Sequence, residues 1–202
     1  KTAPSVTFVC GRLTMRLAWL TDIHLNFLRP DQTRSFLATV QETAPDAVAI
    51  SGDIAEAHDL PYYLELLDDT LQFPIYFVLG NHDYYHGSIS EVRARVQEIC
   101  QQRQRLHYLT QIKEPIALSS SVTLVGHDGW ADARLGNYER SLVQMTDWRL
   151  IGEFAGHNKL DSRAVLERLG DEAATHLRSQ LSIALSNFQK VLVVTHVPPL
   201  RE

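Results

Sequence analysis

The stretch FVLGNHDYY, residues 77–85, places three polar side chains at the end of an apolar segment. The segment IYFVL, residues 75–79, has the length and the β-branched and aromatic content of a buried strand. After Gly80, an amide, an imidazole and a carboxylate follow at Asn81, His82 and Asp83 without helical or strand alternation. A chance match to GNHD in a chain of this composition is expected on the order of once in a thousand sequences. The stretch therefore predicts a functional site at the end of a strand.

The same arrangement follows three more predicted strands, which cover residues 15–21, 47–51 and 190–195. The polar side chains that follow these strands are Asp22 with His24, Asp53, and His196. Each of these is a weak signal alone, because an Asp-x-His pair arises by chance and Gly-Asp is a common turn. Their occurrence in order, on successive strand ends, indicates that they belong to one site.

Helical spacing of apolar residues predicts four helices, between Pro30 and Pro45 and over residues 61–72, 89–103 and 163–188, the last interrupted at Gly170. Residues 115–126 favour a hairpin that turns at three serines. The irregular region that follows, about residues 126–160, is typical of a cap-like loop over a site. Strand–helix alternation predicts a largely parallel sheet, in which ligands bind beyond the carboxyl ends of the strands.

The polar groups at these strand ends form a mixed set of oxygen and nitrogen donors that suits borderline or hard divalent cations. No thiolate is placed among them, which argues against a structural zinc site. One carboxylate between two donor groups can bridge two metal ions about 3.5–4 Å apart. Asp53 lies between the two other groups in chain order and is the natural bridge.

Four blocks of the chain, DIH (22–24), GDIAE (52–56), GNHD (80–83) and VVTHVPP (193–199), resemble the first four sequence blocks of the calcineurin-like metallophosphoesterases. The match runs from about Met15 to the end of the chain, and it is specific at the blocks and loose between them. This resemblance implies an α/β fold with two facing mixed β-sheets flanked by helices, a four-layer sandwich. It also implies a dinuclear metal site at the strand ends, with two divalent ions that would be Mn, Fe or Zn.

The resemblance further implies a role for each matched residue. Asp22 and His24 would bind the first metal, Asp53 would bridge both, and Asn81 and His196 would bind the second. His82 would stand beside the substrate phosphate, and Asp83 would orient its imidazole as a carboxylate fixes a histidine tautomer. Glu56 would support the metal ligands without binding a metal ion itself.

The family closes its site with a late Gly-His-x-His block, whose two histidines each bind one metal. This chain reaches Glu202 without such a block. We therefore interpret residues 15–202 as a metallophosphoesterase domain whose C-terminal part is missing. The alternative is a member that has lost the block and binds metal weakly. Residues 1–14 fit a leader, residues added to the native chain, or an extra strand.

These features predict a phosphoesterase that hydrolyses phosphate mono- or diesters. Two cations lower the pKa of a shared water from about 15.7 toward 7, and His82 as imidazolium would protonate the leaving alkoxide. Candidate substrate contacts are His86, His127 and Trp130. The alternative is a phosphoesterase-like scaffold or binding module with little or no catalysis. Retention of His82 with Asp83 argues for the enzyme, and the missing block argues for the scaffold.

Composition limits the partners of the chain. Its 202 residues, 45% of them apolar, are enough for one sizeable core. A net charge of −5 argues against a basic groove for duplex nucleic acid and leaves a small phosphate ester, including a nucleotide, as the substrate. The sequence contains no run of about 18 apolar residues, so it predicts no membrane span. We expect a cytoplasmic protein, and the sequence does not define its oligomeric state.

Overall fold

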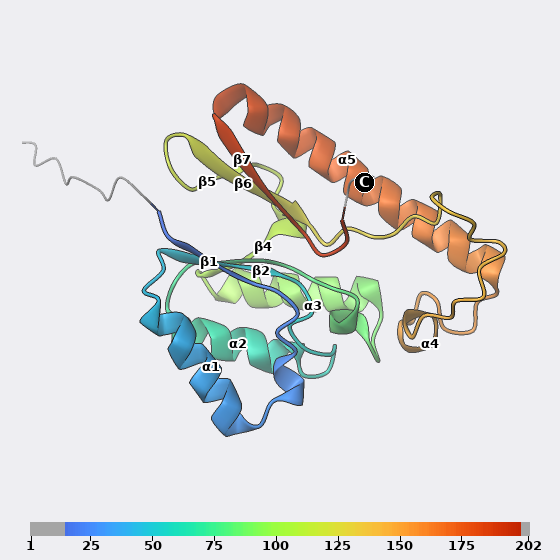
Figure 1. The fold of residues 1–202 in the computed structure, drawn as a ribbon, viewed down its shortest axis with the longest axis horizontal. Helices are drawn as coiled ribbons and strands as arrows, with labels where there is room; N and C mark the ends of the chain where they lie inside the picture. The colour runs from blue at the N-terminus through green and yellow to red at the C-terminus, as the bar shows by residue number, and fades with distance from the viewer. Residues whose placement is uncertain (1–14, 199–202) are drawn as a thin grey trace, which may run out of the picture.

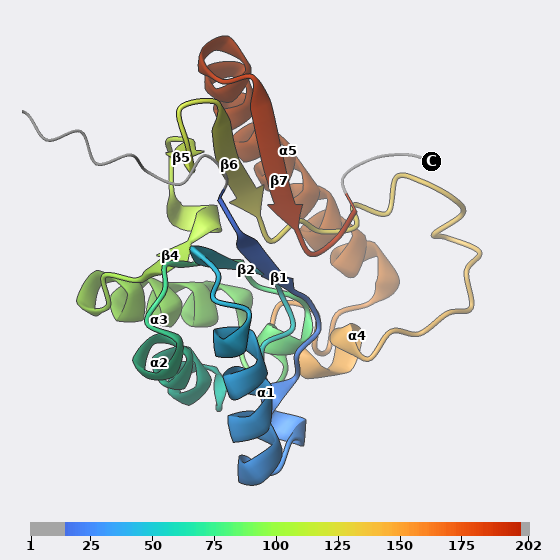
Figure 2. The same cartoon turned by 60° about the vertical axis from the view of Figure 1, so that its left-hand side comes forward.

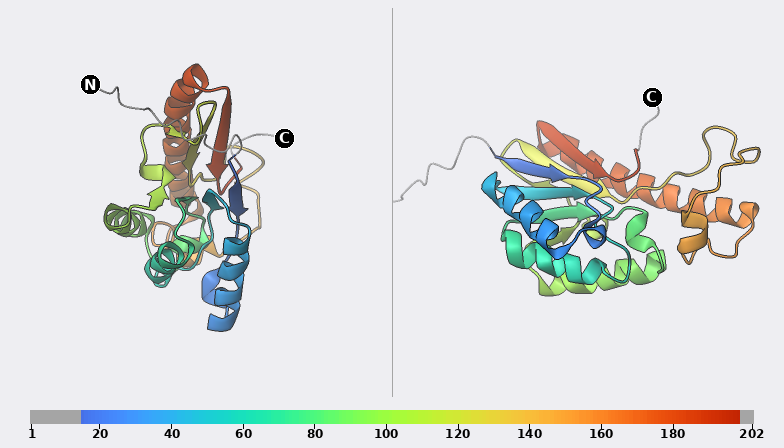
Figure 3. Two further views of the ribbon diagram at one scale, coloured as in Figure 1. Left: turned by 90° about the vertical axis from the view of Figure 1, so that its left-hand side faces the viewer. Right: turned by 60° about the horizontal axis from the view of Figure 1, so that its bottom comes forward.

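The structure, a computed structural model, describes residues 15–198. Two β-sheets pack against each other, with helices α1–α3 on the outer side of the first sheet and α5 on the outer side of the second (Figure 1). The right-hand view of Figure 3 shows the strands between these two helical layers. The prediction of two sheets flanked by helices is confirmed. The leader predicted for residues 1–14 lies outside the described residues.

The first sheet consists of four parallel strands in the order β1 (Leu17–Leu20), β2 (Ala47–Ser51), β3 (Ile75–Val78) and β4 (Leu106–Tyr108). Its register pairs Leu17 with Ala47 and Ile75 with both Val48 and Leu106. Every residue of β2 is buried, because helices cover one face of this central strand and the second sheet covers the other. The first sheet is entirely parallel over the described residues, so only the second sheet is mixed.

Three helices connect these strands and cover one face of the sheet: α1 (Pro30–Glu42), α2 (Leu60–Leu71) and α3 (Ile89–Gln102). The first two carry proline in their first turn, where a missing N–H is tolerated. Ser88 caps α3 by accepting a hydrogen bond from the backbone N–H of Glu91. Each helix buries an apolar stripe against the sheet, and in α2 this stripe consists of Leu60, Leu64, Leu67 and Leu71.

The second sheet contains β5 (Ile116–Ala117), β6 (Val122–His127) and β7 (Lys190–Thr195). The hairpin pair β5–β6 is antiparallel, whereas β6–β7 is parallel and joined through helix α5 (Lys159–Asn187). The predicted break at Gly170 is wrong, because α5 is continuous over 29 residues. A Cβ at Gly170 would meet Asp132, so the glycine allows a loop to approach the helix.

One strand and one α-helix were not predicted from the sequence, β4 and the short helix α4 (Asp147–Leu150). Helix α4 lies in the long segment between β6 and α5. This segment extends away from the two sheets before it returns to α5 (Figure 2). Three short 3-10 helices complete the described structure: η1 (Leu25–Phe27), η2 (His82–Tyr84) and η3 (Leu109–Gln111). The carboxyl ends of β1, β2 and β3 meet the end of β7 at one edge of the fold, where the predicted polar residues lie.

Candidate metal centre

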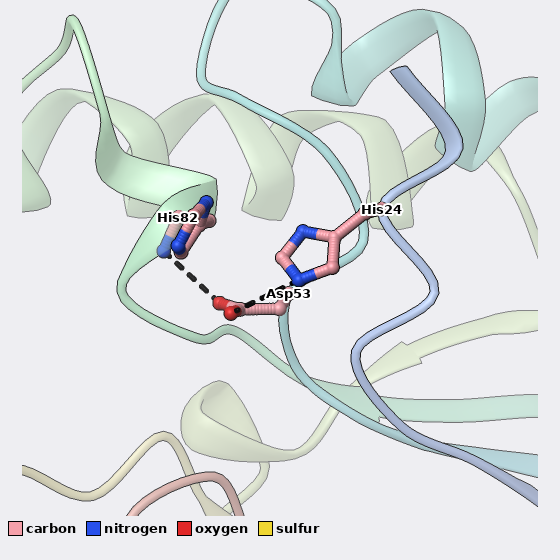
Figure 4. A group of neighbouring side chains, drawn as sticks. All are labelled: His24, Asp53 and His82. Atoms are coloured by element: carbon pink, nitrogen blue, oxygen red, sulfur yellow. Dashed lines mark hydrogen bonds and ion pairs between the residues drawn. The ribbon is translucent and has the colours of Figure 1, made fainter. Parts of the chain in front are cut away.

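The structure brings together the candidate ligands predicted at the four strand ends. One donor group contains His24, Asp53 and His82, and its ligand atoms lie within 4.8 Å of one another (Figure 4). Nε2 of His24 is 3.7 Å from Oδ2 of Asp53. His82 approaches Asp53 through its backbone, since its N–H donates a 3.0 Å hydrogen bond to Oδ1. The imidazole of His82 packs edge to face with that of His24, at 4.7 Å between ring centroids.

A second donor group contains Asp22, Asp53 and His196, again with ligand atoms within 4.8 Å of one another. Nε2 of His196 lies 3.5 Å from Oδ1 of Asp53 and 3.1 Å from Oδ1 of Asn81. Asp53 is therefore common to both groups, with one oxygen directed to each histidine. This arrangement is the one that a bridging carboxylate requires.

Hydrogen bonds around His196 and Asn81 direct Nε2 of the ring and Oδ1 of the amide at one another. Nδ1 of His196 is 2.9 Å from the carbonyl oxygen of Ser51, so a neutral ring that donates there has no hydrogen on Nε2. The amide of Asn81 donates from Nδ2 to Tyr85 and Asp147, which turns its Oδ1 toward His196. Unprotonated nitrogen and oxygen atoms that converge in this way repel unless a cation lies between them. The donor set therefore fits a divalent metal ion.

Three of the candidate ligands have left-handed backbone conformations that non-glycine residues rarely adopt. The φ angles are 50° at Asp22, 38° at His24 and 55° at Asp53. Backbone hydrogen bonds between the loops maintain these conformations, from the N–H of Asp22 to Gly52 and from the N–H of His24 to Asp53. Strain of this kind is found at functional sites, where the surrounding structure enforces it.

Two glycines that precede ligands allow the loops to approach closely. A Cβ at Gly80 would overlap Oδ1 of Asp53, and a Cβ at Gly52 would lie 2.6 Å from Nδ1 of His196. Sequence reasoning treated both glycines only as strand ends. Their position directly before Asp53 and Asn81 was the signal that could have identified them.

The role predicted for Asp83 is corrected by its hydrogen bonds. Its buried carboxylate accepts four backbone N–H bonds of 2.8–2.9 Å, from Asp53, Ile54, Ala55 and Gly80, and these occupy both oxygens. Nδ1 of His82 is buried with no hydrogen-bond partner within residues 15–198. Burial raises the pKa of the Asp83 carboxyl, and the N–H groups oppose that rise. Asp83 therefore joins the loops after β2 and β3 and does not orient His82.

The candidate substrate contacts lie in three different environments. His86 is exposed beside the centre, with Nε2 3.8 Å from Glu56. His127 is buried under α5, where its Nε2 is 3.8 Å from Glu172. The contact with His127 is the largest of the effects that lower the pKa of Glu172 to about 2. We therefore withdraw His127 as a substrate contact. Trp130 packs against Phe154 with ring centroids 5.8 Å apart.

Two buried aspartates outside the predicted ligand set, Asp147 and Asp128, support the centre. Asp147 in α4 accepts hydrogen bonds on Oδ1 from Asn81 (2.9 Å) and from the phenol of Tyr85 (2.7 Å). Burial and the hydrogen bond to Asp147 raise the pKa of Tyr85, so its phenol remains a donor. The buried carboxylate of Asp128 accepts hydrogen bonds from Leu79, Tyr84, Arg93, Tyr108 and Thr110. Its backbone carbonyl also accepts the N–H of His196.

A family model described as calcineurin-like phosphoesterase matches residues 15–201, nearly the whole chain. The chain belongs to this family. Membership carries the expectation of divalent metal ions, which the two donor groups are suited to hold. None of the helices within residues 15–198 is both long and apolar enough to cross a membrane.

Curated relatives match over parts of the chain. An uncharacterized metallophosphoesterase of Campylobacter jejuni is 37% identical over 82 residues, which cover 39% of this chain and 22% of the relative. A UDP-2,3-diacylglucosamine hydrolase of Stenotrophomonas maltophilia is 36% identical over 86 residues, which cover 36% of this chain and 34% of the relative. The matches thus span about a fifth to a third of the length of these relatives.

A solved structure extends the likeness at the level of the fold. The phosphopantetheinyl hydrolase of Mycobacterium tuberculosis superposes with a TM-score of 0.64 over 91% of this chain and 68% of that one. Sequence identity is 16%, so this likeness concerns the fold alone. It agrees with the two-sheet architecture of this calcineurin-like phosphoesterase.

A pocket of about 320 Å³ opens beside the metal centre. Asn81 and His196 form one wall, and the segment between β6 and α5 forms most of the rest. Trp130 is among the lining residues, so its role as a substrate contact stays a prediction, whereas His127 is not among them. The region predicted to be cap-like therefore lies over a cavity adjoining the candidate ligands.

Proposed function

We propose that this chain carries the active site of a metal-dependent hydrolase that cleaves phosphate esters. The observation that supports this most strongly is the position of Asp53, whose two oxygens face His24 and His196 in separate donor groups. Two divalent cations in these groups would activate water near pH 7 and neutralise phosphate oxygens. From the resemblance we assign Asp22 and His24 to the first cation, Asn81 and His196 to the second, and Asp53 to both. In the structure the carboxylate of Asp22 groups with Asp53 and His196.

His82 lies in the donor group of His24 and Asp53, and we propose it not as a ligand but as the acid that protonates the leaving-group oxygen. Its backbone N–H is anchored on Asp53, and its ring lies between those of His24 and Tyr85 with centroid distances of 4.7 and 4.3 Å. An imidazolium at this position would also stabilise negative charge on the phosphoryl oxygens. General acid catalysis of this kind contributes about 10²–10⁴ in rate.

The proposal covers both monoesters and diesters, because the same centre serves either reaction. The name of one relative, a UDP-2,3-diacylglucosamine hydrolase, supports hydrolysis as the reaction class. The native cation (Mn, Fe or Zn) and a cytoplasmic location stay predictions of the sequence. A scaffold without catalysis would have no use for His82 beside the bridging position of Asp53, so we favour the enzyme.

Hydrolysis of p-nitrophenyl phosphate and of bis-p-nitrophenyl phosphate tests the proposal, with added Mn²⁺ or with a chelator. We expect metal-dependent turnover that falls about 10²–10⁴-fold in His82→Ala while calorimetry shows unchanged Mn²⁺ binding. The matched control is His107→Ala, because His107 stacks on Tyr76 in the first sheet and contacts no candidate ligand. Turnover that is indifferent to chelator would refute the metal-dependent reaction. Equal rates for wild type and His82→Ala would remove the acid role.

A further inference from the structure

The pocket beside the metal centre is continuous with the proposed reaction site. Its wall contains Asn81 and His196, whose Oδ1 and Nε2 atoms are 3.1 Å apart and face the place proposed for the second cation. A group attached to a phosphate held at that cation would therefore extend into the pocket. The pocket would therefore receive the group that is esterified to the phosphate.

The chemistry of the lining is apolar. Aromatic and aliphatic side chains form most of the walls, including Trp130, Val143, Met145, Trp148, Phe154 and Leu166. None of the lining residues is Lys or Arg, so the pocket offers no side-chain cation to a second phosphate. Its two carboxylates, Asp128 and Asp147, already accept hydrogen bonds from protein groups. An uncharged hydrocarbon group matches these walls better than a charged or heavily hydroxylated one.

The rim of the pocket shows the same character. Val143 is 65% exposed, Met145 47% and Leu135 54%, although all three line the cavity. Exposed apolar side chains gathered around an opening mark sites where an apolar partner is bound. The volume of about 320 Å³ is that of a pocket for a small ligand group, near the lower end of the ~300–1,000 Å³ range.

We propose that the substrate of this centre is a phosphate ester bearing a flexible acyl- or alkyl-like chain, which binds in the pocket lined by Trp130, Val143 and Phe154. This inference rests on the proposed function, because the phosphate is positioned by the metal centre. Burial of the hydrocarbon chain supplies the binding free energy, so substrates that bury more apolar area in the pocket bind more tightly. A nucleobase or the surface of a second copy of the chain is an alternative occupant that the experiment distinguishes.

The test uses n-alkylphosphonates from ethyl to decyl, below their critical micelle concentrations, as inhibitors of bis-p-nitrophenyl phosphate hydrolysis. A phosphonate has a P–C bond and is not hydrolysed, so its inhibition constant reports binding. We expect this constant to fall about three- to fourfold for each added methylene until the pocket is filled. Fluorescence titration in the presence of chelator gives a second readout, because Trp130 and Trp148 both line the pocket.

Two neighbouring exposed residues supply a matched pair of variants. Val143→Glu places a charge in the pocket wall and is expected to abolish the dependence of the inhibition constant on chain length. Leu142 is 96% exposed and does not line this pocket, so Leu142→Glu is expected to preserve the dependence. Both side chains lie on the surface, so neither change removes packing from the core.

The outcomes separate the two proposals. Hydrolysis that is inhibited equally by ethyl and decyl phosphonate would overturn the hydrocarbon site and leave the proposed function standing. The same result with strong inhibition by nucleosides would assign the pocket to a base, and a flat profile with dimerisation through this face would assign it to a second copy. Chain-length-dependent quenching without any hydrolysis would refute the proposed function and retain the ligand class.

Discussion

Asn81 shows how a single side chain at this centre is fixed from a distant part of the chain. Its Nδ2 donates to Asp147, 66 positions later, while its Oδ1 faces Nε2 of His196. A carboxylate that accepts a hydrogen bond from one end of a ligand side chain fixes the direction of the metal-binding atom at the other end. Asp147 is therefore a positioning residue for the proposed second cation, although it belongs to a helix of only four residues.

We expect Asp147→Ala to weaken Mn²⁺ binding about 10–100-fold, because the amide of Asn81 loses its acceptor and rotates more freely. Asp147→Asn keeps an acceptor oxygen and should restore most of the affinity. Calorimetric titration with Mn²⁺ measures both, and Asp161→Ala in the exposed first turn of α5 is the control. Unchanged affinity in Asp147→Ala would show that Asn81 is oriented by other contacts.

At this scale the sequence predicted the candidate ligands better than their supports. Asp22, Asp53 and Asn81 each follow a strand, and parallel strands bring their carboxyl ends together, so the local pattern was enough to predict that these side chains lie close together. Asp147 has no such signal, because only the fold brings it to Asn81. Asp83 was misassigned because adjacency to His82 in the chain does not show where a side chain points.

Among the elements, the loops after β2 and β3 behave as one unit because Asp83 accepts N–H bonds from both. The first of these loops carries Asp53, and the second carries Asn81 and His82. Buried backbone donors need partners, and here one carboxylate satisfies four of them. The position of the bridging ligand relative to the proposed acid thus depends on Asp83.

We expect Asp83→Ala to lower the free energy of unfolding by about 3 kcal/mol or more, since each buried donor left unpaired costs about 1–3 kcal/mol. Urea unfolding in the presence of chelator measures this without a contribution from metal. His82→Ala is the control and should change the stability far less, since the ring of His82 makes no side-chain hydrogen bond through Nδ1 within the described residues. Equal losses in the two variants would contradict the anchoring role.

Element prediction succeeded where the apolar pattern was long enough to define a period. The helices α1–α3 were located from the spacing of apolar residues, and the strands β2, β3 and β7 from short apolar runs that end at polar residues. In contrast, β4 has three residues and α4 has four, about one helical turn, so neither shows an apolar pattern that recurs. Helix α5 begins at Lys159, before the predicted start at residue 163, because Asn158 caps it by accepting hydrogen bonds from Leu160 and Asp161.

In the molecule as a whole, Asp128 connects the two sheets. It follows β6 of the second sheet, and its carboxylate accepts hydrogen bonds from Leu79 and Tyr108 of the first. Its carbonyl oxygen accepts the N–H of His196, which brings the end of β7 to the other ligands. Asp128 therefore helps to join the end of β7 to the first sheet, together with the contact between Nδ1 of His196 and the carbonyl oxygen of Ser51.

We expect Asp128→Ala to reduce the free energy of unfolding by about 3–5 kcal/mol, because Arg93 loses its buried partner. Thermal and urea unfolding measure the loss. Asp171→Ala is the matched control, because it breaks an exposed ion pair with Arg134 and should cost about 1 kcal/mol or less. A loss in Asp128→Ala no larger than in this control would show that the sheets are held together by other packing.

The left-handed backbone of Asp22, His24 and Asp53 has an evolutionary consequence. Glycine or asparagine adopts such torsions more readily than aspartate or histidine, so selection for heat resistance alone would favour replacing these three residues. Variants recovered that way would gain robustness while shedding the carboxylate and imidazole groups that the reaction needs. Improvement of this scaffold by directed evolution should therefore screen for turnover in every round, and seek durability at positions outside the strained loops.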